Sequence, residues 1–130
     1  MKLIHSFRGL FCAYLFMASM AMAFAGELPF DQKKFDAVVA AGGPVIVDFS
    51  ASWCPTCKAQ RPIVQGLMGQ PKFKDLTLFV ADYDKETALK KALHITQQST
   101  FVVFRAGKEV TRSTGQTDKD VLAGVFDKAL

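Results

Sequence analysis

The chain has 130 residues, half of them hydrophobic, which is enough for one compact domain and too little for two. Its formal charge is +4, from 16 basic and 12 acidic residues, and its lysines and arginines form no long run. Composition and charge therefore exclude a multidomain chain and indicate that nucleic acid is not a partner.

The first 25 residues have the pattern of a secretory signal peptide. Lys2 and Arg8 make the start positive, the following stretch is almost wholly apolar, and Ala23-Phe24-Ala25 has the small-x-small spacing of a cleavage site. An uncleaved membrane anchor is the alternative, but a membrane span needs about 20 apolar residues and this stretch is shorter. We therefore expect residues 26–130 to form the mature domain, in the periplasm or otherwise exported.

Cleavage at that site would change the charge and the cysteine count. Lys2 and Arg8 are two of the 16 basic residues, so their loss against 12 acidic residues leaves a formal charge of +2. Cys12 would also be removed, which leaves Cys54 and Cys57 in an oxidising compartment. A tetrahedral zinc site needs four ligands. Too few soft ligands would remain, so we expect no metal.

Apolar patterns separated by turn residues predict four helices and four strands. The first helix is expected over residues 28–43, with Asp31 as its N-cap and Phe30 packed on Phe35. Residues 45–49 then form a continuous strand-like run, which is typical of a central strand covered on both faces.

The remaining elements continue this alternation. In chain order they are a helix over 54–68, a strand over 76–81, a helix over 85–93, two hairpin strands over 100–104 and 109–112, and a last helix that Thr117 caps with Asp120 as its partner. Alternating strands and helices imply parallel strand pairs, and the hairpin adds antiparallel ones. The predicted fold class is α/β, with a central mixed β-sheet flanked by helices on both faces.

Two cysteines two residues apart stand at the start of the second expected helix, in Trp53-Cys54-Pro55-Thr56-Cys57-Lys58. A helix N-terminus presents unpaired N–H groups and a positive dipole end, and both favour the nucleophilic thiolate. We expect Cys54 to be the exposed attacking sulfur and Cys57, one turn further in, to be the resolving sulfur. The spacing alone leaves open a structural clip, a redox pair or half of a metal site.

Asp48 is the one charged residue in the buried strand over 45–49. Burial raises the pKa of a carboxyl group that has no close partner. If it lies near Cys57, Asp48 is expected to accept and return the proton of that thiol as a general base. The alternative is a local capping or hydrogen-bonding role.

Residues 47–58, together with Pro62, the hairpin and Gly115, resemble the thioredoxin superfamily over essentially all of the mature chain. The resemblance implies a thioredoxin-like fold, a redox-active Cys54–Cys57 disulfide, and thiol–disulfide exchange with protein disulfide substrates. It implies no cofactor beyond the dithiol. The Trp-Cys-Pro-Thr-Cys version resembles exported reductive thioredoxins, so the expected electron donor is a membrane thiol-transfer protein. We expect a monomer.

Two positions depart from the family pattern. Ser99 stands where thioredoxins have a cis-proline, and we expect a trans bond before it, because a cis bond before a non-proline costs about 2.5–4 kcal/mol. Its hydroxyl adds a donor near Cys54 and leaves the sulfurs less shielded. Val80 stands where the family often has a lysine beside the buried acid, so the pKa of Asp48 should rise further. The residues expected to shape the site are Trp53, Pro55, Thr56, Ser99 and Thr100.

Three functions fit this pattern, and a protein-disulfide reductase is favoured. A disulfide oxidase or isomerase would need a strongly stabilised thiolate. Strong oxidases in this superfamily often have a histidine inside the CxxC and an inserted helical domain. This chain has Pro-Thr between its cysteines and no room for an insertion. A metal- or cluster-carrying protein is the third possibility, with Ser99 leaving the two cysteines open. It would need a dimer or a small-molecule ligand to complete the coordination.

Overall fold

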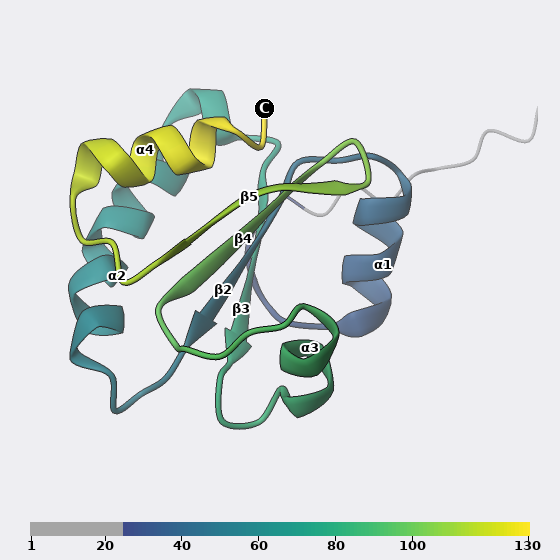
Figure 1. Cartoon of the computed structure of the whole chain (residues 1–130). Helices are drawn as coiled ribbons and strands as arrows, with labels where there is room; N and C mark the ends of the chain where they lie inside the picture. The colour runs from purple at the N-terminus through teal and green to yellow at the C-terminus, as the bar shows by residue number, and fades with distance from the viewer. Residues whose placement is uncertain (1–24) are drawn as a thin grey trace, which may run out of the picture.

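The computed structural model describes residues 25–130, which fold as a five-stranded sheet with helices on both faces (Figure 1). The elements in chain order are β1 (Gly26–Pro29), α1 (Gln32–Ala40), β2 (Val45–Ser50), α2 (Pro55–Met68), η1 (Pro71–Phe73, a 3-10 helix), β3 (Thr77–Asp82), α3 (Thr87–Ala92), β4 (Thr100–Arg105), β5 (Lys108–Thr114) and α4 (Lys119–Asp127). The expected signal peptide, except for its last residue, and Cys12 lie outside the described residues. Within 25–130, no helix is long and apolar enough to cross a membrane.

The strand order in the sheet is β1-β3-β2-β4-β5. β3 pairs in parallel with β1 and β2, whereas β4 pairs antiparallel with β2 and β5. The expected mixed sheet is therefore confirmed, with β2 at its centre. Because β2 is central, both of its faces are buried, which explains why nearly all of its residues are apolar.

Two apolar cores lie on opposite faces of the sheet. α1 and α3 cover one face, and α2 and α4 cover the other (Figure 1). Side chains alternate along a strand. Val47 therefore lies in the core beneath α1 and α3, whereas Ile46 lies in the core beneath α2 and α4. The same alternation puts Asp48 on the face that α2 covers.

The predicted first helix, over residues 28–43, is wrong at its start. Gly26–Pro29 forms an edge strand instead, and α1 begins only at Gln32. Four residues are too few to show a strand's alternation, and Pro29 is tolerated because β1 is at the edge of the sheet. Asp31 is confirmed as the N-cap, since its carboxylate accepts a hydrogen bond from the Lys34 N–H at 2.9 Å.

Three further element boundaries differ from the predictions. α4 is capped by Asp118 rather than Thr117, because the Asp118 carboxylate accepts from the Val121 N–H at 3.0 Å. β5 is longer than expected and α3 is shorter. The hairpin turn has positive φ at both Ala106 (50°) and Gly107 (80°), the backbone of a type I′ turn, whose twist matches that of the strands it joins.

Candidate active site

The turn after β2 places both cysteines at the start of α2. Cys54 is the N-cap of α2, and its Sγ accepts a hydrogen bond from the Cys57 N–H at 3.1 Å. Pro55 takes the first helical position, where the missing N–H of proline costs nothing, and Thr56 follows it in the same turn. Both cysteines are free thiols. The helix start therefore supplies the N–H donor that the sequence predicts for Cys54.

The prediction that Cys54 is the exposed sulfur is wrong. Cys54 is only 1% exposed and Cys57 is 6% exposed. Both pack with Ala51, and the Tyr83 ring lies against this small cluster. The burial of the cysteines also depends on Tyr83 and on the loop before β4, which are far from the CxxC in sequence, so the local pattern gives no sign of it.

Trp53 is the exposed member of the motif. Its side chain is 55% exposed, and its Nε1–H donates to the Asp84 carboxylate at 2.7 Å. This bond fixes the indole to the loop after β3, beside the buried cysteines. The expected role of Trp53 in shaping the site remains a prediction.

Ser99 contacts both sulfurs at once. Its Oγ lies 3.1 Å from the Cys54 Sγ and 3.0 Å from the Cys57 Sγ. The sequence predicts the first contact but not the second. Residues 25–130 contain no cis peptide bond, so the expected trans bond before Ser99 is confirmed. Ser99 has a φ of 59°, in the left-handed region that few non-glycine residues adopt.

The loop that carries Ser99 is fixed by hydrogen bonds on its main chain and by its neighbours. The Ser99 N–H donates to the Phe49 carbonyl at 2.8 Å, and its own carbonyl accepts from the Gly115 N–H at 2.9 Å. The Thr100 hydroxyl donates to the Gln97 carbonyl at 2.9 Å, which closes the turn before β4. Ser99 and Thr100 are both buried. The hydroxyl between the sulfurs is therefore firmly positioned.

Sequence reasoning missed Gln60, which is 2% exposed and lies one turn after Cys57 on α2. Its amide donates to the Gln116 carbonyl at 2.8 Å and to the Ser99 carbonyl at 3.4 Å. Gln60 thus connects α2 to the loop that positions the Ser99 hydroxyl. The available signal was a polar residue on the apolar side of a helix, three positions after the second cysteine.

The surroundings of Cys54 favour its thiolate. Burial raises the pKa of the Cys54 thiol, but hydrogen bonds from the Cys57 and Ser99 side chains, the Cys57 N–H and Gln98 outweigh burial. The pKa of Cys54 is consequently lowered from its ordinary value. Because only the thiolate attacks a disulfide, this shift increases the reactive fraction near neutral pH.

Removing the Ser99 hydroxyl is expected to raise the pKa of Cys54. A hydrogen bond to a charged group contributes ~1.5–3 kcal/mol, which corresponds to about one to two pKa units. Ser99→Ala and Ser99→Gly both remove the hydroxyl, and glycine adopts the positive φ without strain. The measurement is the ultraviolet absorbance of the thiolate across a pH series.

Thr114→Val is the matched control, because the Thr114 hydroxyl contacts Thr100 and neither sulfur. It should leave the pKa of Cys54 unchanged. An unchanged value in both Ser99 variants would show that the hydroxyl does not stabilise the thiolate.

Asp48 is buried in β2, at 5% exposure, as the sequence predicts. Its register partners are Val80 on β3 and Phe101 on β4, so Val80 does stand beside the acid. Burial raises the pKa of Asp48 to about 7, while Arg61 lowers it and Glu27 raises it. The expected rise is confirmed, but the two charges beside the acid were not predicted.

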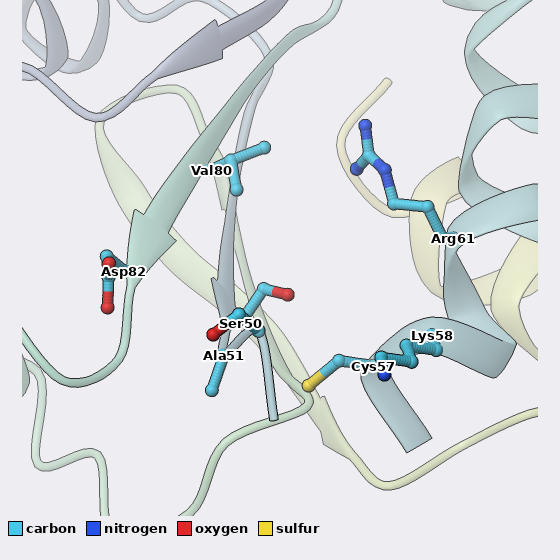
Figure 2. A pocket seen from close by; sticks show the side chains of 8 residues that line it. Ser50, Ala51, Cys57, Lys58, Arg61, Val80 and Asp82 are labelled. Atoms are coloured by element: carbon cyan, nitrogen blue, oxygen red, sulfur yellow. The ribbon is translucent and has the colours of Figure 1, made fainter. Parts of the chain in front are cut away.

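A cavity of about 520 Å³ lies between the ends of β2 and β3 and the first turns of α2 (Figure 2). Its lining residues are Ser50, Ala51, Ser52, Cys57, Lys58, Arg61, Val80 and Asp82. The Cys57 sulfur points toward the end of β2, and Arg61 extends from α2 toward the side of Val80 (Figure 2). Among residues 25–130, no three His, Cys, Asp or Glu side chains are grouped so that they could hold a metal ion.

Comparison with known proteins places this geometry in context. The family model described as thioredoxin matches residues 27–128. A thioredoxin of Chlamydia muridarum is 34% identical over 88 residues, covering 68% of this chain and 84% of that protein. Thioredoxin Asp f 29 of Aspergillus fumigatus is 37% identical over 86 residues, covering 65% of this chain and 78% of its own. The crystal structure of Trxlp from Edwardsiella tarda superimposes with a TM-score of 0.76 at 36% identity, over 78% of this chain and 98% of that one.

Proposed function

Because the chain belongs to the thioredoxin family and is a thiol–disulfide oxidoreductase with a CxxC active site, we propose that it is an exported reductant of protein disulfides. The observation that carries the proposal is the pair of free thiols at the start of α2. Cys54 accepts hydrogen bonds there that lower its pKa, and Cys57 lies one turn away to complete the exchange.

The reaction proceeds by two sulfur displacements. The Cys54 thiolate attacks one sulfur of a substrate disulfide, so a mixed disulfide forms and the other substrate sulfur leaves as a thiolate. Cys57 then loses its proton and attacks the Cys54 sulfur. The Cys54–Cys57 disulfide forms, the second substrate sulfur leaves, and two electrons have passed from the dithiol to the substrate.

Asp48 is the proposed acceptor of the Cys57 proton. It lies on the face of β2 that α2 covers, and α2 carries Cys57. Because burial raises the pKa of Asp48 to about 7, both its charged and its neutral forms are populated near neutral pH. A group in that range takes a proton and returns it with little cost in either direction.

Export and the electron donor are further parts of the proposal. The supporting feature is the signal-like sequence that ends at Ala25. The Gly26 N–H donates to the Leu76 carbonyl at 2.9 Å, and the new N-terminal ammonium would keep a donor there after cleavage. An exported reductant needs electrons from the cytoplasm, so a membrane thiol-transfer protein is the proposed donor.

The test is the reduction potential of the Cys54–Cys57 pair, measured by equilibration with glutathione or dithiothreitol buffers. We expect a value near that of thioredoxin, about −270 mV. A value near about −120 mV, typical of a strong oxidant, would reverse the proposed direction of electron flow. Thiolate stabilisation raises the reduction potential of a dithiol, so the lowered pKa of Cys54 acts toward the more oxidising value. The measured potential therefore decides the direction of electron flow.

A further inference from the structure

We propose that Arg61, held in place by Glu27, is a positioning residue that supplies the countercharge for Asp48, a task that Val80 cannot perform. The inference rests on the proposed function, in which Asp48 takes the proton of Cys57. It assigns a role to an ion pair formed by β1 and α2.

Strand register places the Asp48 and Glu27 side chains on one face of the sheet. Asp48 lies two residues after Ile46, whose side chain is in the core beneath α2 and α4. Glu27 on β1 is the register partner of Leu78, which belongs to the same core. Glu27 and Asp48 therefore both lie on the face that α2 covers.

Helix periodicity places Arg61 on the side of α2 that carries Cys57. Arg61 follows Cys57 by four residues, so the two side chains lie on one side of α2. The Arg61 guanidinium forms an ion pair with the Glu27 carboxylate, and both side chains are about one-third exposed (36% and 32%). Figure 2 shows Arg61 extending from α2 toward the side of β3 that carries Val80.

Two cavities share Arg61 as a lining residue. The cavity lined by Cys57 is also lined by Arg61. A second cavity of about 340 Å³ is lined by Glu27 and, like the first, by Ser50, Arg61 and Val80. Arg61 thus stands between the active-site thiol and the edge strand.

Among the groups around Asp48, Arg61 is the cation that lowers its pKa. Its strand neighbours are apolar, with Val80 on β3 and Phe101 on β4. The charged groups that shift its titration are Arg61 on α2 and Glu27 on β1, and they act in opposite directions. Arg61 stabilises the carboxylate, and Glu27 both holds the guanidinium and limits its effect. The balance keeps Asp48 able to take and release a proton near neutral pH.

The test is the titration of Asp48 in the reduced full chain, followed by NMR of ¹³C-labelled aspartate carboxyl groups. Arg61→Gln should move the Asp48 midpoint upward by about one pH unit, because an opposite charge is lost. Glu27→Gln should move it downward, because a like charge is lost and Arg61 is freed. If the ion pair were purely structural, both variants would shift the Asp48 midpoint in the same direction, because each breaks the same ion pair.

Arg112→Gln is the matched control, since Arg112 pairs with Glu109 on β5. It should leave the Asp48 midpoint unchanged. The pH at which the mixed disulfide of the enzyme resolves, measured in single turnover, should follow the Asp48 midpoint in both test variants.

Shifts of the same sign in the two test variants, or no shift, would overturn the role of Arg61. These outcomes are distinct from failure of the proposed function. The titration is read without turnover, whereas the proposed function fails if the reduction potential is that of an oxidant.

Discussion

Replacing Cys54 by serine is expected to abolish disulfide reduction, with a loss of about 10⁴-fold or more in rate, as is seen when other enzymes lose their nucleophile. A serine hydroxyl is not ionised at neutral pH and cannot form a disulfide with a substrate sulfur. The measurement is the reduction of insulin disulfides in the presence of dithiothreitol, corrected for the uncatalysed reaction.

Cys57→Ser is the matched variant, and it should behave differently. Its Cys54 still attacks the substrate, but no resolving thiol follows, so the mixed disulfide accumulates and is seen by mass spectrometry under non-reducing conditions. The comparison matters because Cys54 is the more deeply covered of the two residues. Mixed disulfides trapped by Cys54→Ser instead of Cys57→Ser would show that the two roles are reversed.

The second large expected effect is a loss of folding stability as pH rises, caused by the buried Asp48. The pKa of Asp48 is about 7 in the folded protein and 3.8 as its ordinary value. Between these values the folded state binds more protons than the unfolded state, so the free energy of unfolding falls as pH rises. Three units at about 1.36 kcal/mol each amount to about 4 kcal/mol, lost between roughly pH 4 and pH 7.

Asp48→Asn removes the titrating group and should remove most of this loss. The variant should therefore gain stability relative to the parent protein at pH 8, and much less at pH 4, in urea unfolding measured at both values. Asp75→Asn, at an exposed aspartate, is the control and should keep the parent protein's pH dependence. A variant at position 48 whose stability follows the parent at every pH would refute the linkage.

The parts of the site that local sequence encodes were predictable. The CxxC spacing and the proline at the helix start are contiguous, and they correctly place Cys54 and Cys57 at the start of α2. Asp48 interrupts an apolar run within one strand, so its burial was also readable. In each case the relevant neighbours lie within a few residues of one another.

The remaining features depend on contacts between distant segments. Glu27 and Arg61 are 34 residues apart, and Cys54 and Ser99 are 45 residues apart. The four residues of β1 become a strand only through pairing with β3. The covering of Cys54, the ion pair beside Asp48 and the second sulfur contact of Ser99 all arise from this packing, which single-sequence periodicity does not report.

The backbone at Ser99 also limits how the sequence can change. Its φ is 59° and its N–H donates to the Phe49 carbonyl at 2.8 Å, whereas proline fixes φ near −65° and has no N–H. A Ser99→Pro substitution would thus remove this hydrogen bond and force the loop to change its backbone conformation. The residue at position 99 and the left-handed backbone of its loop therefore depend on each other, so a proline at this position also requires a different conformation of the loop.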